Sequence, residues 1–425
     1  MTLTPARDTR SRWPGLDVVP SGPRARVSAR IARRLFTAAV SRLDVTVHLD
    51  HPAHAGGRET LGKGGPVAVV HRPEEFFARI GRHQLIGFGE AYLTGAWDEG
   101  PDGDLGAFLG VLAAEMADLV PRSLQRFRTV VAQRPPGWMK SSKKNSKNNI
   151  SHHYDLSNDL FELFLDPSLS YSAALFDGDP ALARPEDLEE AQYRKIDRML
   201  DEAGVGEGTR LLEIGSGWGA LAIRAARRGA VVRTITLSEE QKALADQRIA
   251  AAGLSESISV EICDYRDLAG SYDAIVSVEM IEAVGWQYWR SYFETLDRVL
   301  APGGRVCIQA ITMPHDRMLA TRNTYTWIHK YIFPGGMLPS LEAVDETTRS
   351  HTRLRMHEPF SMGLHYVPTL RFWDRSFLDA REQVLALGFD ETFMRMWHFY
   401  LEYSRAGFAS GYIGDHQLTF TRDDA

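Results

Sequence analysis

Cysteine and long hydrophobic runs are scarce in this sequence. Only Cys263 and Cys307 occur among its 425 residues, and both fall in predicted buried strands, which excludes a disulfide framework and indicates a reducing compartment. The longest weakly charged stretch, residues 107–120, contains two acidic residues and is too short to span a bilayer. The first arginines are followed by Trp-Pro-Gly and not by an apolar core, so no signal peptide is expected. These absences predict a cytoplasmic protein that is soluble or peripheral.

Basic charge is also in short supply overall. The net charge of −6 at pH 7 argues against a general nucleic-acid binder. Arginines nevertheless crowd residues 24–42 and lysines crowd residues 140–147, and both clusters could face anionic lipid. In residues 27–43 apolar positions recur at helical spacing with arginines between them. A surface helix packed on its own domain is favoured over a helix on a membrane surface.

The chain is long enough for two domains. Composition predicts a flexible leader over 1–22, an α+β domain over 23–132, an exposed linker over 133–150 and a second domain over 151–425. In the first domain, residues 45–49 and 67–70 alternate like strands. The glycine-rich and aromatic-rich residues 87–97 predict a tight turn that packs Tyr92 and Trp97.

A glycine-rich turn organises the second domain. Residues 210–214 form a short apolar run typical of a buried parallel strand, and residues 220–228 continue as a helix. Between them, Gly215, Gly217 and Gly219 allow the backbone to turn sharply and a ligand to lie against the peptide groups. Taken alone, this pattern fits an ordinary strand-to-helix turn equally well.

Later strands strengthen the prediction of a ligand site. They are expected at 230–237, 259–263, 272–278 and, after a turn at 301–304, 304–311. Polar residues follow three of them: residues 238–241, then Asp264, placed to accept from an adenine amino group, then residues 279–282. This order predicts an α/β, Rossmann-like sheet. Trp218 stands where a pyrophosphate site would need a glycine, which favours S-adenosylmethionine over a dinucleotide.

Two segments outside the sheet are predicted to cover the pocket. Residues 151–172 combine polar and aromatic side chains and predict a lid. Residues 316–341 form an apolar insertion that carries Trp327 and Tyr331 at a position where substrate pockets are often roofed.

Several motifs together resemble the cyclopropane-fatty-acyl-phospholipid synthase family. They are His153-Tyr-Asp-Leu-Ser-Asn-Asp159, Tyr171-Ser172, Glu213-Ile-Gly-Ser-Gly-Trp-Gly219, Thr236-Leu-Ser-Glu-Glu-Gln241, Asp264-Tyr-Arg-Asp-Leu268 and Lys330-Tyr-Ile-Phe-Pro334. The resemblance covers about residues 75–422. It implies a class I methyltransferase domain preceded by a smaller α+β domain that helps to present the lipid. It also implies methyl transfer from S-adenosylmethionine to the double bond of an unsaturated, oleoyl-type phospholipid, at the inner face of the membrane.

The resemblance implies site residues as well. Those that would hold the cofactor are Tyr154, Tyr171, Ser172, Glu213, Gly215, Gly217, Thr236, Ser238, Gln241, Asp264 and Tyr265. The family surrounds a bound bicarbonate, the proposed proton acceptor, with a Cys, a Glu, a His and a Tyr. This chain keeps Glu282 and Tyr366 but has Ala173 and Gln309 where the Cys and the His are expected. Gln309 can form hydrogen bonds but cannot carry charge, so either the bicarbonate is held differently or Glu282 acts more directly as the base.

The altered anion site bears on the product. An alkene is a weak nucleophile, so the rate must come from positioning and from excluding water. Methylation leaves a carbocation, which the aromatic faces of Phe176, Trp327, Tyr331 and Tyr366 could stabilise. Loss of a methyl proton with ring closure gives a cyclopropane. A prior hydride shift gives an exocyclic methylene, the precursor of methyl-branched chains such as tuberculostearic acid, and the changed anion site favours this product.

Other functions and partners stay open at this point. A catalytically silent lipid-binding protein is disfavoured by the intact glycine turn, and a methyltransferase for a soluble acceptor is disfavoured by the apolar insertion. A reductase that completes the product and a second copy of the chain, forming a homodimer, are candidate partners. The adjacent His152 and His153 have no spaced partner set, which argues against a metal site.

Overall fold

The computed structural model describes residues 13–50, 57–115 and 157–423. The predicted linker, residues 133–150, and the first part of the predicted lid, residues 151–156, lie outside the described residues.

Two compact units make up the chain. One contains Met1–Val130 and Phe389–Ala406, and the other contains Val131–Gly388 and Gly407–Ala425. A segment close to the C-terminus therefore groups with the N-terminal elements, whereas the sequence placed all of residues 151–425 in the second domain.

The first unit has a four-stranded sheet with helices. Its strands are β1 (Thr46–Asp50), β2 (Arg58–Leu61), β3 (Val67–Val70) and β4 (Trp97–Asp98), in the order β2-β1-β3-β4. Its helices are α2 (Pro23–Val40), α3 (Pro73–Leu93), α4 (Leu105–Ala114) and most of α20 (Glu391–Ala409). The β1–β3 pair is parallel, and the β1–β2 and β3–β4 pairs are antiparallel. This mixture matches the predicted α+β character.

Trp97 lies at the centre of the core of this unit and is 1% exposed. Its ring contacts those of Phe76, Phe88, Tyr92, Phe108 and Phe399, at centroid distances of 4.5 to 6.4 Å.

The tight turn predicted over residues 87–97 is wrong in extent, because α3 continues to Leu93. The backbone leaves helical geometry at Gln84, where φ is 50°. A Cβ at Gly87 would lie 2.0 Å from the carbonyl oxygen of Arg79. Gly87 therefore serves the close approach of backbone at this kink rather than a turn.

The second unit is built on a sheet with parallel strands at its centre. Its strands are β5 (Arg210–Ile214), β6 (Val231–Thr236), β7 (Ile258–Ile262), β8 (Tyr272–Val278), β9 (Leu300–Thr312), β10 (Leu354–Met356), β11 (Phe360–Ser361) and β12 (Gly414–Arg422). The order is β10-β12-β9-β8-β5-β6-β7, and β11 pairs with β12. β5 to β9 pair in parallel, whereas β12 pairs antiparallel with β9 and β10. The predicted Rossmann-like sheet is confirmed.

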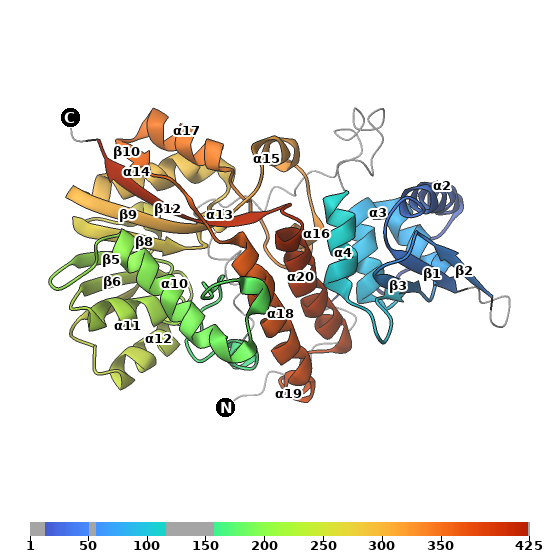
Figure 1. Cartoon of the computed structure of the whole chain (residues 1–425), viewed down its shortest axis with the longest axis horizontal. Coiled ribbons are helices and arrows are strands. Elements are labelled where there is room, and N and C mark those ends of the chain that lie inside the picture. The colour runs from blue at the N-terminus through green and yellow to red at the C-terminus, as the bar shows by residue number, and fades with distance from the viewer. Residues whose placement is uncertain (1–12, 51–56, 116–156, 424–425) are drawn as a thin grey trace. The chain divides into compact units, whose positions relative to one another are not determined.

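The second unit also contains helices, several of which cover the two faces of the sheet. They are α9 (Asn158–Glu162), α10 (Leu188–Glu202), α11 (Ala220–Arg227), α12 (Glu239–Ala251), α13 (Ile281–Val284), α14 (Trp289–Val299), α15 (His315–Thr321), α16 (Trp327–Tyr331), α17 (Leu341–His351), α18 (Gly363–Asp379) and α19 (Arg381–Ala386). Short 3-10 turns lie at Pro180–Leu182, Pro185–Asp187, Tyr265–Asp267 and Trp286–Tyr288. One core cluster joins the sheet to α10, α11 and α12, and a second joins it to α14 and α17 on the opposite face (Figure 1).

The turn expected at residues 301–304 lies inside β9 as a bulge. Tyr272 and Ala274 pair with Leu300 and Arg305, so the extra residues of β9 protrude between these two pairs. Gly303 takes the left-handed conformation there, with φ of 72°. The glycines were correctly recognised as irregular backbone, but the strand begins before them.

None of the described helices combines the length and the apolar composition that crossing a bilayer requires.

Candidate active site

The glycine turn after β5 leaves open space in front of its backbone. Gly215, Gly217 and Gly219 have φ of 98°, 49° and 88°, a region that side chains disfavour. The N–H groups of Gly215 and Ser216 donate to the carbonyl of Ile235 on β6, at 2.9 and 3.1 Å, which fixes the turn to the sheet. A Cβ at Gly217 would meet no atom within 4 Å. The turn thus has the form of a cradle that a nucleoside cofactor fits.

Glu213, two residues before the first glycine, is a buried acid. Its side chain is 3% exposed, and burial raises the pKa of its carboxyl to about 8. Its Oε2 has no hydrogen-bond partner among the described residues. A buried acid of this kind is suited to meet a cationic or hydroxyl-bearing ligand.

The polar residues predicted at the end of β6 form one local network. The Thr236 hydroxyl donates to Oε1 of Gln241 at 2.8 Å and accepts from the N–H of Ser238 at 3.1 Å. The Ser238 hydroxyl accepts from the N–H of Gln241 at 3.2 Å and so caps α12. The structure brings these three residues together, and part of their bonding capacity stabilises the helix start.

Asp264 and Tyr265 follow β7. The Asp264 carboxylate forms an ion pair with Arg266, at 2.6 Å between Oδ2 and Nη2. It also accepts from the N–H of Arg266 at 3.0 Å. The Tyr265 ring packs edge-on against Tyr292 at 5.4 Å. The expected contact of Asp264 with adenine stays a prediction, and it would share the carboxylate with Arg266.

The described part of the predicted lid contacts the glycine turn. Trp218 donates from Nε1 to Oδ1 of Asn158 on α9 at 2.8 Å, and its ring lies 4.9 Å from that of Phe161. Phe161 in turn meets Tyr171 edge-on at 5.1 Å. Tyr171 therefore lies close to the turn, while Tyr154 is outside the described residues.

Glu279 is a site residue that the sequence analysis did not single out. It lies directly after β8, and its Oε1 accepts from the N–H of Ala173 and from Nε2 of Gln309, both at 2.9 Å. Its Oε2 accepts from the hydroxyl of Tyr366 at 2.6 Å. Its φ of 47° is unusual for a residue with a side chain. The signal available in the sequence was an acid directly after a predicted strand.

Glu282 and Asp415 lie in the same cluster. Oε1 of Glu282 accepts from the N–H of Ile311 at 2.5 Å, and Oδ2 of Asp415 accepts from Nε2 of Gln309 at 2.9 Å. Burial, followed by the charge of Glu279, raises the pKa of Glu282 to about 8. Burial and both glutamates raise the pKa of Asp415 well above its usual range. Together with Glu279, Gln309 and Tyr366, these two residues are called the carboxylate cluster below.

Lys195 of α10 is a second unforeseen residue. It is 1% exposed, and its Nζ lies 2.5 Å from the hydroxyl of Ser172. Burial lowers the pKa of Lys195 to about 8, against the opposing effect of nearby acids that include Glu279 and Asp415. Ser172 thus binds a buried cation, and the sequence showed Lys195 only as a polar position in a predicted helix.

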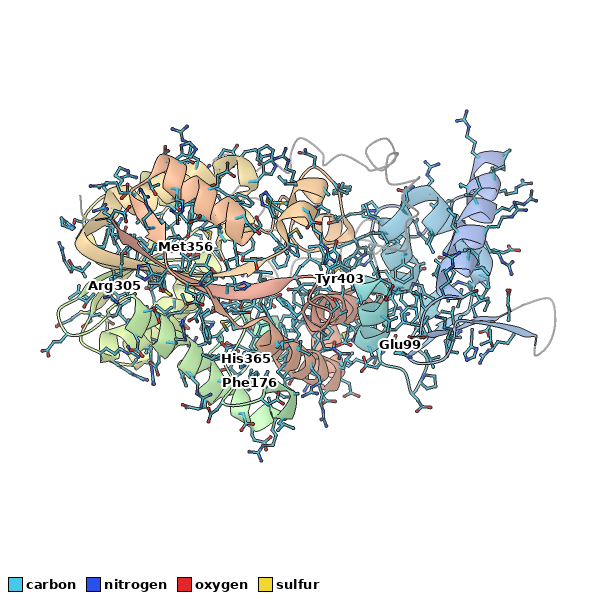
Figure 2. The ribbon with its side chains drawn as sticks, turned by 45° about the horizontal axis from the view of Figure 1, so that its top comes forward. Glu99, Phe176, Arg305, Met356, His365 and Tyr403 are labelled. Atoms are coloured by element: carbon cyan, nitrogen blue, oxygen red, sulfur yellow. The ribbon has the colours of Figure 1, made fainter. Side chains whose placement is uncertain are left out.

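The aromatic residues proposed to face a cation occupy three places. Tyr366 stacks on Phe408 at 4.4 Å while its hydroxyl reaches Glu279. Phe176 lies beside His365, with parallel rings 6.4 Å apart (Figure 2). Trp327 and Tyr331 pack on each other at 5.3 Å within α16.

The end of the apolar insertion reaches the carboxylate cluster. The N–H of Met337 donates to the carbonyl of Glu282 at 2.7 Å. Because α16 is also tied to this loop by a 2.7 Å contact between His329 and the carbonyl of Gly336, the insertion borders the cluster. That it roofs a substrate pocket stays a prediction.

Topology places the glycine turn and the cluster side by side. The strand order β7-β6-β5-β8 means that the chain runs outward from β5 and returns at β8, so the crevice between these two strands is a switch point where ligands bind. Ile214 pairs with Ser277, and a Cβ on Gly215 would lie 3.4 Å from the Met280 side chain. A cofactor on the glycine turn would therefore lie next to the cluster.

Comparison with known proteins agrees with this geometry. A family described as mycolic acid cyclopropane synthetase matches residues 141–418. The chain belongs to this family. The predicted resemblance is thus confirmed, and so are the methyltransferase activity and S-adenosylmethionine as its cofactor.

Relatives of this family resemble the chain over most of its length. The tuberculostearic acid methyltransferase UfaA1 of Mycobacterium tuberculosis is 49% identical over 97% of this chain and 96% of its own. The cyclopropane-fatty-acyl-phospholipid synthase of Escherichia coli K12 is 33% identical over 85% of this chain and 90% of its own. Among solved structures, the cyclopropane synthase MmaA2 from M. tuberculosis has a TM-score of 0.59 and 30% identity, covering 64% of this chain and 97% of its own. The mycolic acid cyclopropane synthase CmaA1, complexed with SAH and CTAB, has a TM-score of 0.58 and 31% identity, covering 67% of this chain and 98% of its own.

Proposed function

We propose that the chain transfers a methyl group from S-adenosylmethionine to the double bond of an unsaturated phospholipid acyl chain and forms a methylene-branched chain. With an oleoyl substrate the product would be a 10-methylene stearoyl chain. The observation that carries this proposal is the carboxylate cluster next to the glycine turn, because a carbocation formed there must lose a proton to a nearby base. The 49% identity with a tuberculostearic acid methyltransferase supports the methylene product.

The cofactor would lie across the carboxyl ends of β5, β6 and β7. The backbone of Gly215 and Gly217 would approach it closely, Glu213 would meet its positive charge, and the network at the start of α12 would line one side. Asp264 and Tyr265 would border the base, and the segment with Tyr171 and Ser172 would cover the pocket. When bound, S-adenosylmethionine supplies an electrophilic methyl group.

The chain's own residues then direct the reaction. As the alkene attacks, a carbon–carbon bond forms, the sulfur–methyl bond breaks and its electron pair stays on sulfur. The resulting cation would lie near the ring of Tyr366, which stacks on Phe408 and whose face favours positive charge. A hydride shift moves the cation to the methyl-bearing carbon. A methyl proton then passes to a carboxylate of the cluster, which Glu282, Gln309 and Tyr366 line, and its electrons form the exocyclic double bond.

The chemical structure of the fatty acid formed tests this proposal. Purified protein, S-adenosylmethionine and vesicles containing oleoyl phospholipid are incubated, and the fatty acids are examined by mass spectrometry and NMR. We expect exocyclic methylene protons and no cyclopropane protons. A cyclopropane signal would establish the alternative, which the similarity to the E. coli synthase favours. Methylation of soluble acceptors but not of vesicles would overturn the lipid assignment.

We propose two partners, of which the first follows from the product. Converting a methylene into a methyl branch needs two electrons and two protons, so we propose that a separate reductase acts next. We also propose a homodimer, which light scattering of the purified chain tests directly.

The exposed face of α2 is proposed to contact the membrane. The helix packs through small residues, with Ala25 and Ala32 buried, and a Cβ on Gly81 of α3 would lie 2.7 Å from the backbone of Ser28. Two larger apolar residues near its C-terminal end also pack on the domain: Val40 is 2% exposed, and the Phe36 ring meets those of Phe76 and Phe77 edge-on. Val27, Ile31 and Leu35 point the other way and are 56%, 54% and 51% exposed. The expected packing of the apolar positions on the domain thus holds for Phe36, Val40 and Leu43 but not for Ile31 and Leu35.

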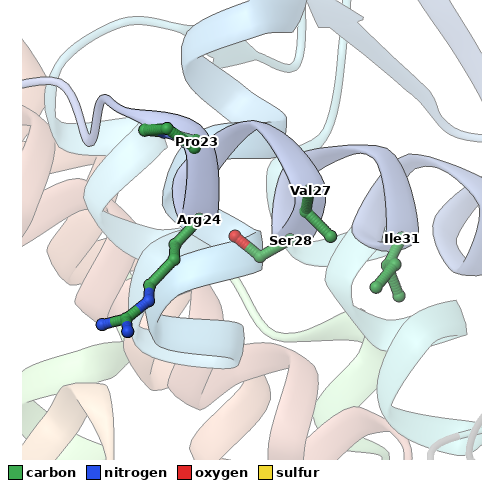
Figure 3. Close-up of a pocket in the computed structure, with 5 residues that line it drawn as sticks. All are labelled: Pro23, Arg24, Val27, Ser28 and Ile31. Atoms are coloured by element: carbon green, nitrogen blue, oxygen red, sulfur yellow. The ribbon is translucent and has the colours of Figure 1, made fainter.

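Arginines accompany these apolar residues. Arg24, Arg30 and Arg34 are exposed, and Arg24, Val27 and Ile31 line a shallow hollow on the helix (Figure 3). Exposed apolar residues flanked by cations suit the boundary of an anionic bilayer, such as the cytoplasmic leaflet. We therefore propose peripheral attachment to the inner face of the membrane.

Vesicle flotation tests this attachment. Ile31→Asp should reduce binding to vesicles rich in phosphatidylglycerol by at least about tenfold, since it places a charge where an apolar side chain would enter the lipid. Leu182→Asp is a matched control, because Leu182 is 79% exposed on the other unit. Equal loss in both variants, or none in Ile31→Asp, would contradict the role of α2.

A further inference from the structure

The groups that could hold a small anion in the cluster are already occupied by the chain itself. The Ala173 N–H, the Gln309 amide and the Tyr366 hydroxyl all donate to the carboxylate of Glu279. A bicarbonate ion would need the same donors, and it would have to lie against a carboxyl group. The residues present therefore do not fit bicarbonate as an additional bound group.

We propose that Glu279 is the built-in proton acceptor of the reaction and that the enzyme needs no bicarbonate. This inference rests on the proposed function and transfers the role of base from Glu282, where the sequence placed it, to a residue three positions earlier.

Hydrogen bonding locates the negative charge on Glu279. Three carboxyl groups, those of Glu279, Glu282 and Asp415, cannot all ionise in one buried cluster, because like charges at close range repel. Glu279 accepts three hydrogen bonds, whereas Glu282 accepts one from Ile311 and Asp415 accepts one from Gln309. Burial raises the pKa of Glu279 as it raises those of Glu282 and Asp415. Donors stabilise the ionised form of an acid, so Glu279, with three donors, is the acid of the cluster that ionises most readily.

One buried cation, Lys195, lies near the carboxylate cluster. Lys195 lies within electrostatic reach of Glu279 and Asp415, and it opposes the effect of burial on both acids. Glu213 also faces Lys195 from β5. One buried cation can offset one carboxylate charge, which agrees with a single ionised acid in the cluster.

Free capacity for a proton remains on Glu279. A carboxylate offers about four lone-pair positions, and three are taken by the donors above. Residue 279 as a whole is only partly buried, and the proposal requires that a reacting chain approach its carboxylate. The remaining position, on Oε2 beside the Tyr366 hydroxyl, is the one that would accept the proton.

The backbone at Glu279 supports a functional role. Its φ of 47° is strained for a residue with a side chain, and glycine would relieve this strain. The N–H of Glu279 donates to the carbonyl of Gln309 at 2.8 Å, which holds the residue in this conformation. Strain of this kind is retained where it positions a group, here the carboxylate against Tyr366.

A purely structural role is the competing explanation. Glu279 could serve only to tie α18, β9 and the segment at Ala173 together. The two roles predict different results for a variant that lacks the Glu279 carboxylate. If Glu279 is the base, a small diffusible carboxylic acid can restore activity. If Glu279 only holds the three segments together, it cannot.

Transfer of the proton to Glu279 completes the reaction. A carbon–hydrogen bond of the methyl group attached to the cationic carbon breaks, its proton passes to Oε2 of Glu279, and its electron pair forms the carbon–carbon double bond. The proton afterwards leaves to solvent, so no oxidant, reductant or added anion is required.

Glu279→Gly is the decisive variant, because it removes the carboxylate and relieves the strained φ. In buffer freed of carbon dioxide, the wild-type enzyme should keep its full rate on oleoyl vesicles. Glu279→Gly should lose about 10²- to 10⁴-fold in kcat, the usual contribution of a positioned base, while its affinity for S-adenosylmethionine stays within about twofold. Added formate or bicarbonate should restore at least about tenfold of that loss, since the three donors remain. Glu256→Gly, in an exposed turn, is the matched control and should show neither loss nor rescue.

Each other outcome has a distinct meaning. No methylated lipid from the wild type, although cofactor binds, would refute the proposed function itself. Wild-type turnover that requires bicarbonate would overturn only the built-in base. An unrescued loss in Glu279→Gly with intact cofactor binding would favour the structural tie, and a product bearing a methyl and a hydroxyl group would mean that Glu279 directs water onto the cation instead of taking a proton.

Discussion

Replacement of Glu213 by glutamine tests how burial of charge shapes this site. Glu213 is 3% exposed at the end of β5, and burial raises the pKa of its carboxyl from 4.5 to about 8. Its Oε2 has no hydrogen-bond partner among the described residues. Glutamine has nearly the same shape as the protonated acid, so Glu213→Gln should preserve the packing while removing the titration.

The change in the free energy of unfolding with pH follows from the difference between the pKa values of Glu213 in the folded and unfolded states. Because the folded pKa is raised, the folded state binds more protons than the unfolded state between pH 4.5 and about 8. The stability present below pH 4.5 is therefore lost as the pH rises through this window, by about 1.4 kcal/mol per pH unit. Over the whole window the loss is about 5 kcal/mol for the wild type, and Glu213→Gln should escape it.

Urea unfolding at pH 5.5 and pH 7.5 measures this difference. The wild type should lose roughly 2–3 kcal/mol more of its free energy of unfolding between these two pH values than the variant does. Other raised acids, such as Glu282, contribute equally to both proteins and cancel. Parallel stability profiles for the two proteins would refute the reasoning, because they would mean that Glu213 does not titrate in this window.

The same residue reports on the cofactor. S-adenosylmethionine carries a positive sulfonium and an ammonium group, and a cation next to Glu213 lowers the pKa of its carboxyl. At pH 7 an acid of pKa about 8 is about 90% protonated, so binding should release up to about 0.9 proton. Calorimetry in two buffers of different ionisation enthalpy measures this number, and Glu213→Gln should release correspondingly less. Equal release from both proteins would remove Glu213 from the cofactor site.

Three further substitutions separate the roles within the site. Gly217→Val should weaken S-adenosylmethionine binding at least about tenfold in calorimetry, because φ of 49° disfavours a branched residue; unchanged affinity would place the cofactor elsewhere. Tyr366→Phe should lower kcat about 10- to 150-fold, since a hydrogen bond to a charged carboxylate contributes about 1.5–3 kcal/mol. An unchanged kcat would mean that the hydrogen bond from Tyr366 to Glu279 does not contribute to catalysis. Glu282→Gln should cost less than about tenfold at pH 7, because its pKa of about 8 keeps it mainly neutral; a loss as large as in Glu279→Gly would return the role of base to Glu282.

The glycine turn and the parallel strands were predictable because their signals are local. Residues 210–214 are an apolar run of strand length, and the three glycines that follow have positive φ in the structure. β8 begins and ends at the predicted residues, Tyr272 and Val278. A strand buried on both faces needs a continuous apolar stretch, so a few adjacent residues are enough to locate it in the sequence.

The carboxylate cluster was only partly predictable, because its members come from distant parts of the chain. Asp415 lies on β12, an antiparallel strand that was not predicted from the local sequence pattern. It reaches the site only because β12 pairs with β9. Lys195 reads as an ordinary polar position of α10 until the fold buries it. Glu279 was visible as an acid after a strand, but its direction depends on φ of 47°, which the sequence does not reveal for a residue other than glycine.

The charges of this site suit a reaction that passes through cations. Burial favours the neutral forms of Glu213, Glu282 and Asp415, as their raised pKa values show. A sulfonium or a carbocation placed among them makes ionisation less costly, so the pocket gains negative charge only when positive charge is present. Binding is then stronger to the cationic state than to the neutral alkene, which is the condition for lowering a barrier. Burial raises the pKa of Glu279 as well, but this acid already has three donors in place. It therefore ionises more readily than Glu282 or Asp415 and is the group best suited to take the proton.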